Sequence, residues 1–255
     1  QVYIIGPPVA AFTNTPAGCA TVTVNFTNQS TGDSLHYNWG VASSTGTSFT
    51  GGTNNTSTNP NIQFTTAGTF TVTLTTSNSC ATSIADTILT IKSPPIVTLA
   101  AIPGGCAPYT VTPSATYNAG GGTISSYAWT FTGGTPATAT TSAAPSVTWN
   151  TAGNYSVQII ATNECGPDTA IQTFTVKPLP TSNAGLDQVV CVGTSVSLGT
   201  SSTAGYTYSW SSIPAGFSSS SSNPSTTPAA TQTFVVTTAL NGCTKNDTAI
   251  VTVNP

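Results

Sequence analysis

Six cysteines and three of the four tryptophans follow one another in a repeating order along the 255 residues of this chain. The order is Cys, Trp, Cys in each of three groups, and the first cysteines of successive groups are 87 and 85 residues apart. Self-similarity at a fixed period indicates a tandem array in which each repeat is one structural unit. A period of this length is that of one small domain. The groups are Cys19, Trp39 and Cys80; Cys106, Trp129 and Cys165; and Cys191, Trp210 and Cys243.

Proline-containing segments close each repeat. Proline cannot extend a strand ladder, and short proline-rich linkers are stiff. We therefore expect three domains, at residues 1–93, 94–178 and 179–255, joined end to end as a semi-rigid rod. The closing segments are Ile91–Pro95, Val176–Pro180 and Asn254–Pro255.

Within each repeat, apolar residues alternate with threonine and serine, which is the pattern of half-buried β-strands. Tyr127, Trp129 and Phe131, for example, share one side of a predicted strand. No helical pattern with caps is present. The predicted fold class is all-β, with three tandem sandwiches of about seven strands each. The tryptophans expected in the three cores are Trp39, Trp129 and Trp210.

Charge is almost absent from the sequence. Charged residues make up 4% of it, against about 25% in an average soluble protein. Three lysines and no arginine cannot neutralise a phosphate backbone, so we expect no nucleic-acid partner. No apolar run approaches the ~18–20 residues that a membrane span requires, so we expect no membrane insertion. The sequence starts at Gln1 without a signal-peptide pattern, as expected of a processed product or an interior piece.

Several segments resemble a known family. The first repeat contains Val22–Gly32, Tyr37–Trp39 and Asn59–Leu74, and these resemble PKD-type immunoglobulin-like modules of secreted Bacteroidota surface proteins. The third repeat resembles a sister module through Ala184–Cys191 and Asn241–Cys243. The resemblance covers nearly the whole chain. It implies three immunoglobulin-like sandwiches in a rod, an extracellular position at the cell surface, and export by the type IX pathway.

The resemblance also implies a function. Such a chain is expected to be a non-catalytic structural or adhesive segment of a large surface filament or adhesin, with a role in gliding motility or attachment. The expected partners are neighbouring modules of the same chain and a surface polysaccharide or protein ligand, and no cofactor is expected. The alternative is a carbohydrate-binding or accessory module of a secreted enzyme. That alternative requires exposed aromatic side chains, for which the candidates are Phe12, Tyr206 and Phe217.

One departure from the family concerns calcium. The family often follows its tryptophan with an acidic, glycine-rich turn, Asp-Phe-Gly-Asp-Gly. The corresponding segments here carry no acidic residue, and Ca²⁺ prefers several carboxylate oxygens. We therefore expect no metal site in these turns. The segments are Gly40–Val41, Thr130–Gly134 and Ser211–Ser212.

An even cysteine count in a chain that resembles extracellular proteins implies disulfides. In an immunoglobulin-like sandwich, the first cysteine of each repeat precedes the second strand, and the second cysteine follows a strand that runs in the same direction. The two then lie at opposite poles, ~23 Å apart at ~3.3 Å per residue, whereas a disulfide needs Cα atoms within ~7 Å. This geometry predicts bonds across the joints, Cys19–Cys165 and Cys106–Cys243, and leaves Cys80 and Cys191 for modules outside this sequence. The alternative is pairing within each module, Cys19–Cys80, Cys106–Cys165 and Cys191–Cys243.

The residues offer little for catalysis. The only histidine, His36, has Asp33 nearby, but no nucleophile-elbow pattern accompanies them. The only glutamate, Glu164, lies close to Asp168 in a predicted turn, which does not suit a glycosidase pair. Lys92 and Lys177 fall at strand ends beside the linkers, where exposure disfavours an isopeptide crosslink. We expect the chain not to be an enzyme.

Four of the five aspartates are followed by serine or threonine and then an aliphatic residue. This pattern is similar to the O-glycosylation signal of exported Bacteroidota proteins, and glycans would help to solubilise a surface with so little charge. The alternative is that aspartate opens a strand and threonine belongs in one. The acceptors predicted by the pattern are Ser34, Thr87, Thr169 and Thr248.

Overall fold

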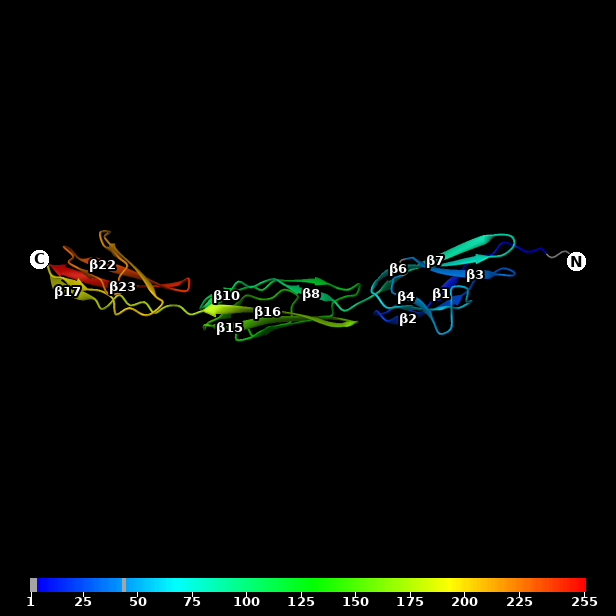
Figure 1. The fold of residues 1–255 in the computed structure, drawn as a ribbon, viewed down its shortest axis with the longest axis horizontal. Coiled ribbons are helices and arrows are strands. Elements are labelled where there is room, and N and C mark those ends of the chain that lie inside the picture. The colour runs from blue at the N-terminus through cyan, green and yellow to red at the C-terminus, as the bar shows by residue number, and fades with distance from the viewer. Residues whose placement is uncertain (1–3, 43–44) are drawn as a thin grey trace.

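The computed structural model describes residues 4–42 and 45–255, so positions 1–3 of the first predicted domain lie outside it. The described chain is all-β and forms three sandwich modules placed end to end, with the two termini at opposite ends of a long rod (Figure 1). Each module has its own hydrophobic core. The buried residues of these cores fall within residues 24–91, 97–176 and 184–251, so each core is drawn from one of the three predicted ranges.

Module 1 packs a four-stranded sheet, in the order β1-β2-β5-β4, against a three-stranded sheet, in the order β3-β6-β7. Its strands are β1 (Phe12–Asn14), β2 (Val22–Asn28), β3 (His36–Ala42), β4 (Thr47–Thr50), β5 (Asn61–Phe64), β6 (Gly68–Ser77) and β7 (Thr82–Ile91).

Module 2 has a five-stranded sheet, β13-β12-β15-β16-β9, faced by the pairs β10-β14 and β11-β8. It has more strands than the seven expected, because β9 and β13 are two-residue additions at the edges of the large sheet. Its strands are β8 (Ile96–Leu99), β9 (Gly105–Cys106), β10 (Tyr109–Val111), β11 (Ala115–Asn118), β12 (Ser126–Phe131), β13 (Thr138–Ala139), β14 (Val147–Trp149), β15 (Gly153–Asn163) and β16 (Gly166–Lys177).

Module 3 repeats the five-stranded sheet, in the order β17-β23-β22-β19-β20, and faces it with the pair β18-β21. Its strands are β17 (Gln188–Cys191), β18 (Val196–Ser197), β19 (Thr207–Ile213), β20 (Ser218–Ser219), β21 (Ser225–Thr226), β22 (Gln232–Leu240) and β23 (Cys243–Asn254).

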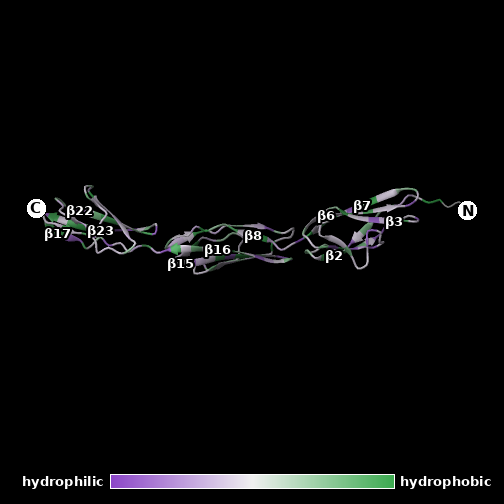
Figure 2. Ribbon diagram, in the orientation of Figure 1, coloured by the Kyte–Doolittle hydropathy of each residue, from purple (hydrophilic) through white to green (hydrophobic). Residues whose placement is uncertain are grey.

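The three repeated tryptophans occupy the same place in each module. Trp39, Trp129 and Trp210 are 1–2% exposed, so their predicted core position is confirmed. Each indole N–H donates to a backbone carbonyl 11 to 18 residues further along, at 2.9–3.0 Å. A buried indole needs such a partner, because an unpaired N–H in an apolar core is costly. Apolar residues run along the strands of every module rather than gathering in one of them (Figure 2).

We expect Trp129→Ala to destabilise module 2 by about 3–5 kcal/mol, because it empties a large core volume and removes the indole hydrogen bond. Hydrogen–deuterium exchange followed by mass spectrometry should show faster exchange in peptides from residues 96–177, with modules 1 and 3 little changed. The matched control is Ile171→Ala in the same module, where the side chain is 56% exposed. Unchanged protection of module 2 in Trp129→Ala would show that this side chain does not organise the core.

Candidate functional site: the two joints between modules

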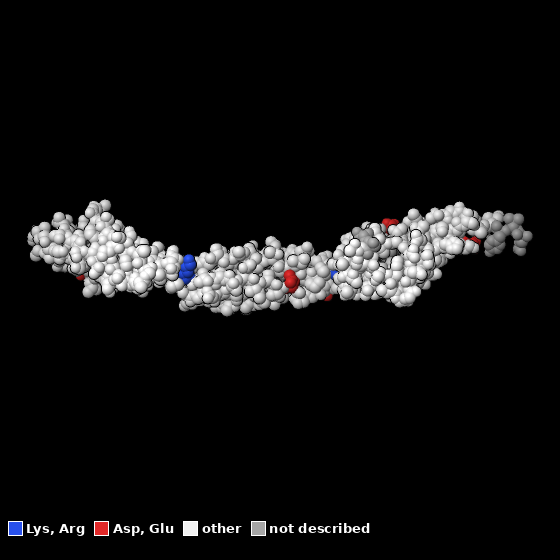
Figure 3. Space-filling model, viewed as in Figure 1, with Lys and Arg blue, Asp and Glu red and all other residues white. Residues whose placement is uncertain are grey.

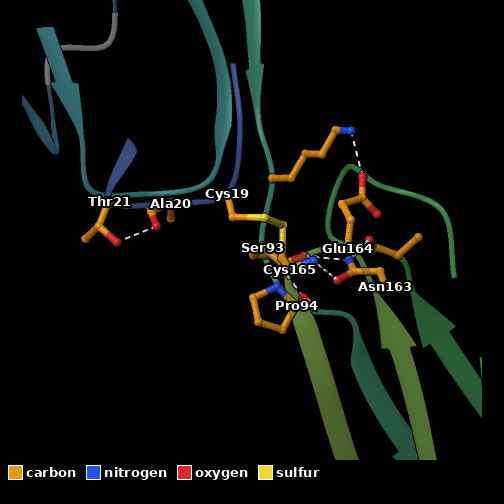
Figure 4. Close-up of a disulfide and its surroundings, with 10 residues drawn as sticks. Cys19, Ala20, Thr21, Ser93, Pro94, Asn163, Glu164 and Cys165 are labelled. Atoms are coloured by element: carbon orange, nitrogen blue, oxygen red, sulfur yellow. Dashed lines mark hydrogen bonds and ion pairs between the residues drawn. A yellow bond between two sulfur atoms is a disulfide. The ribbon is translucent and has the colours of Figure 1, made fainter. Parts of the chain in front are cut away.

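Both joints of the rod are crossed by a disulfide. Cys19 of module 1 is bonded to Cys165 of module 2, with Cα atoms 5.5 Å apart. Cys106 of module 2 is bonded to Cys243 of module 3, with Cα atoms 5.7 Å apart. These are the cross-joint pairs that the strand directions predict. Figure 4 shows the first of them, between the ribbon of module 1 and the hairpin turn of module 2.

The alternative pairing within each module is not the one the structure has. It would have bonded Cys80 and Cys191 to the other cysteines of their own modules, but both are free and exposed. The reason is the one given by the strand directions: the two cysteines of a module lie at its opposite poles.

Backbone contacts hold the first cysteine of modules 1 and 2 beside the end of that module's last strand. Cys19 forms a parallel bridge with Lys92, and the N–H of Ala20 donates to the Lys92 carbonyl at 2.8 Å. At the second joint, Cys106 pairs in parallel with Lys177, and the N–H of Ala107 donates to the Lys177 carbonyl at 2.9 Å. Each first cysteine is therefore held beside the start of the linker, facing the next module.

A buried asparagine ties the linker to the pole of module 2. Asn163 is 4% exposed, and its Oδ1 accepts a hydrogen bond from the N–H of Cys165 at 2.8 Å. Its Nδ2 donates to the carbonyls of Ser93 and Ala119 at 2.7 and 3.0 Å. The same side chain thus positions the disulfide and holds the linker, as Figure 4 shows. The last proline of the linker, Pro95, is buried in module 2.

The lysines at the ends of the last strands also reach across the joints. Lys92 Nζ lies 2.6 Å from Glu164 Oε1, and Lys177 Nζ donates to the Asn241 carbonyl at 3.0 Å. The hydrogen bond from Lys92 and nearby backbone hydrogen bonds hold the pKa of the Glu164 carboxyl below its ordinary value. Charged side chains are sparse over the visible surface, and basic atoms lie at the joints (Figure 3).

The asparagine was not singled out in the sequence analysis, although the sequence carries a signal for it. An asparagine stands two residues before the second cysteine in every repeat, at positions 78, 163 and 241. The constant spacing from a cysteine would have marked it as part of the same site.

The residues considered for catalysis lie apart or have structural partners. His36 is exposed at the start of β3. Glu164 binds Lys92, and Asp168 Oδ2 accepts the N–H of Val97 at 2.7 Å, which ties β16 to the first strand of module 2. Within residues 4–42 and 45–255, no group of three or more His, Cys, Asp or Glu is placed to hold a metal ion. In the same residues, no helix long and apolar enough to cross a membrane is found.

The aromatic candidates for sugar stacking, which the alternative function requires, do not form an exposed row. Phe12 packs against Trp39 with ring centroids 5.0 Å apart, and Phe217 packs against Phe234 at 5.2 Å. Tyr206 is half-buried, and its hydroxyl accepts the N–H of Thr181 at 3.4 Å. Phe12 and Phe217 pack at the edges of the cores, and Tyr206 contacts a backbone N–H.

The candidate glycosylation acceptors fall into different settings. Thr169 and Thr248 are exposed on the outer face of the last strands, Ser34 is exposed in a turn, and Thr87 is half-buried. Two of the neighbouring aspartates have a structural task. Asp168 accepts the N–H of Val97, and Asp247 accepts the N–H of Ala184 at 2.8 Å, so each binds the last strand of its module to the first segment.

Comparison with known proteins supports this architecture in part. Residues 92–178 match the sequence model of the PKD domain. The match covers module 2, about a third of the chain. The remaining residues form β-sandwiches on either side of this matched segment. A PKD domain and disulfides indicate an extracellular protein, since disulfides persist in oxidising compartments. A search of curated proteins gave no match.

Solved structures with several immunoglobulin-like domains are similar over nearly the whole chain. An I-band fragment of titin matches 99% of this chain and 100% of its own, with 12% identity and a TM-score of 0.41. Three N-terminal domains of the highly immunogenic outer capsid protein of bacteriophage RB49 match 97% and 100%, with 13% identity and a TM-score of 0.42. Eight N-terminal domains of Down syndrome cell adhesion molecule match 94% of this chain and 35% of that one, with 14% identity and a TM-score of 0.47. The β-sandwich fold of the three modules is defined by their own strands and strand pairing.

Asn163→Ala should loosen the first joint and cost about 1–3 kcal/mol, because it leaves the N–H of Cys165 and two backbone carbonyls without their partner. Chemical denaturation should report the loss of stability, and hydrogen exchange should locate it in the segments around residues 93, 119 and 165. Asn246→Ala, at an exposed position, is the control and should change neither. If the two variants have the same stability and the same hydrogen exchange, Asn163 does not stabilise the first joint.

The Lys92–Glu164 pair should depend on pH in one direction. Because the pKa of Glu164 is lowered in the folded protein, the pair contributes at neutral pH and is lost as the pH falls through that lowered pKa, below the ordinary value of 4.5. A carboxyl-carbon NMR titration should place the midpoint of Glu164 below 4.5 in the native chain and return it toward 4.5 in Lys92→Ala. Identical midpoints in both proteins would mean that the pair does not form in solution.

Proposed function

We propose that this chain is a non-catalytic structural or adhesive segment of a large extracellular surface filament or adhesin, and that its task is to keep its modules in a stiff line under tension. The observation that supports this most directly is the overlap of the two disulfides. One closes residues 19–165 and the other closes residues 106–243, so residues 106–165, the greater part of module 2, lie within both loops.

The overlap shortens the covalent path through the rod. A pull on the two ends passes from residue 1 to Cys19, crosses to Cys165, returns along the backbone to Cys106, crosses to Cys243 and continues to residue 255. This path holds about 90 residues, against 255 for the unbridged chain. At ~3.5 Å per residue, the bridged chain can extend to about 300 Å and the unbridged chain to about 900 Å.

The surface is better suited to short-range contact with other molecules than to attracting them by charge over long distances. The formal net charge is -3 and only nine residues are charged, so long-range repulsion between neighbouring rods or from a surface is weak. Threonine and serine hydroxyls offer hydrogen bonds to a polysaccharide or protein ligand. Export by the type IX pathway and a role in gliding motility or attachment, which the family resemblance implies, belong to this proposal.

Pulling a single molecule by its two ends tests the mechanical proposal. The oxidised chain, in a Cys80→Ser, Cys191→Ser background that prevents thiol exchange, should stop extending at about 300 Å even after module 2 unfolds. Full reduction is the control, and should allow about 900 Å with the unfolding of all three modules. Extension of the oxidised chain beyond about 300 Å would contradict the covalent shortcut.

We also propose O-glycosylation at Ser34, Thr87, Thr169 and Thr248, supported by the repeated Asp-Ser/Thr-aliphatic pattern. Glycopeptide mapping of protein purified from its native source should find glycan mass on the peptides that contain these four residues. Thr169 and Thr248 should be occupied most fully because they are exposed. Native material in which none of these four residues carries a glycan would end this proposal.

A further inference from the structure

We propose that Asn241 is a site of spontaneous chemical modification, at which its side-chain amide is lost as ammonia and an aspartate or isoaspartate forms, and that Lys177 of the neighbouring module promotes this reaction. The site lies at the second joint, close to the disulfide between Cys106 and Cys243. The inference goes beyond the proposed mechanical function and does not depend on it, because it rests on one hairpin turn and one contact across the joint.

The turn that carries Asn241 contains the only Asn-Gly sequence of the chain. Asn241 and Gly242 link β22 to β23 outside the strand ladder, since Leu240 pairs with Cys243. Their φ angles are 50° and 85°, as a tight two-residue hairpin turn requires. Both residues are exposed, and a Cβ added at Gly242 would meet no atom within 4 Å. The reacting groups are therefore neither buried nor crowded.

The reaction of this pair depends on the absence of a side chain on Gly242, which leaves its backbone nitrogen free to approach the asparagine. The Gly242 nitrogen loses its proton to water or hydroxide and attacks Cγ of Asn241, and the side-chain nitrogen leaves as ammonia. The product of this step is a five-membered succinimide ring. Water then adds to one of the two carbonyl carbons of the ring and breaks the bond from that carbon to the Gly242 nitrogen. The sum consumes one side-chain amide and one water, and releases one carboxylate and one ammonium ion.

Asn241 differs from the asparagines at the same place in the other two modules. The side-chain amides of Asn78 and Asn163 each donate to two carbonyls and accept the N–H of the cysteine two residues further on. In the part of the chain that the structure describes, no such hydrogen bond holds the Asn241 side chain. Rotation of the Asn241 amide toward Gly242 therefore breaks no hydrogen bond, whereas the same rotation in Asn163 would break three.

Lys177 contacts an oxygen that takes part in the reaction. Its Nζ donates to the main-chain carbonyl of Asn241 at 3.0 Å. This carbonyl belongs to the same peptide group as the Gly242 N–H, so the negative charge formed when that nitrogen loses its proton is shared with the oxygen that Lys177 holds. A positively charged donor at an oxygen that gains negative charge lowers the barrier to the step. Lys177 therefore favours the attack of the Gly242 nitrogen on Cγ.

The same contact predicts which product forms in excess. Water can add to the main-chain carbonyl carbon of the ring or to Cγ, and Lys177 polarises the main-chain carbonyl. Addition there leaves the main-chain carbon as a carboxylate and passes the chain through Cγ, and this product is isoaspartate. Addition at Cγ would give aspartate instead. We therefore expect Lys177 to raise the share of isoaspartate at residue 241.

The product would give the second joint a charge pair of the kind present at the first. At the first joint Lys92 faces the carboxylate of Glu164, with Nζ and Oε1 2.6 Å apart. At the second joint Lys177 faces an uncharged carbonyl until Asn241 reacts. Modification adds one carboxylate next to Lys177, in a chain that has only six acidic residues. Each joint would then carry one lysine–carboxylate pair between its modules.

The test is storage of the full chain, with its disulfides intact, at neutral to mildly alkaline pH. Peptides are sampled over time, and liquid chromatography with mass spectrometry separates asparagine, aspartate and isoaspartate at each position. We expect conversion at Asn241 to be several-fold faster than at Asn246, which is exposed on the same strand β23 but is followed by Asp247. Equal rates at these two asparagines, or an absence of conversion at Asn241, would overturn the proposal.

Variants of Lys177 separate its role from the ordinary reactivity of an exposed Asn-Gly pair. Lys177→Met removes the donor and should slow conversion of Asn241 about two- to fivefold, the size of an exposed charge contact. It should also lower the ratio of isoaspartate to aspartate, which a merely structural role of Lys177 would not change. Lys177→Arg should restore both the rate and the ratio, because its guanidinium can donate to the same carbonyl.

Lys245→Met is the matched control, because it removes an exposed lysine of β23 and leaves the contact of Lys177 in place. It should change neither the rate nor the ratio at Asn241. An unchanged or faster rate in Lys177→Met, or an isoaspartate ratio equal to that of the parent chain, would overturn the role assigned to Lys177.

Discussion

The arrangement of the whole rod depends on one constraint: the two cysteines of a module lie at opposite poles and are too far apart to bond to each other. Cys19 and Cys106 are held by parallel bridges at the ends of the last strands, and Cys165 and Cys243 stand at hairpins that point back toward the preceding module. Each bond must therefore cross a joint. Because successive bonds overlap along the chain, stiffness of the joints and limited extension follow from the same geometry.

The linkers and their neighbours add non-covalent contacts to the disulfide at each joint. A disulfide alone would leave rotation about its bonds, but Asn163 adds hydrogen bonds to the linker, and the proline at the end of the linker is buried in the next module. Lys92 and Lys177 also reach across the joints. Such exposed polar contacts contribute little stability individually. Two of the three lysines of the chain therefore lie at the joints between modules.

The sequence was sufficient for the features that depend on periodicity and strand direction. The alternation around Trp39, Trp129 and Trp210 places these side chains in the cores, and the direction of the flanking strands is enough to favour the cross-joint disulfides. Contacts with backbone carbonyls could not be predicted in this way. The partners of Asn163 lie 44 and 70 residues away, and no side-chain type marks them. The packing of Phe12 could not be predicted for a related reason, since it depends on how the sheets meet around Trp39.

The near absence of charge on the surface also affects contacts between neighbouring rods. Repulsion between like charges does not keep two ends apart, and the exposed isoleucines on the outer strands, such as Ile84 and Ile88, do not keep lateral faces apart either. Edge strands without charges or proline are prone to pairing with other chains. A modification on the outer strands would oppose this lateral contact without touching the poles, because Thr169 and Thr248 lie on strand faces and the joint cysteines lie at the ends. Glycans there would limit lateral contact between rods and leave the joints unchanged.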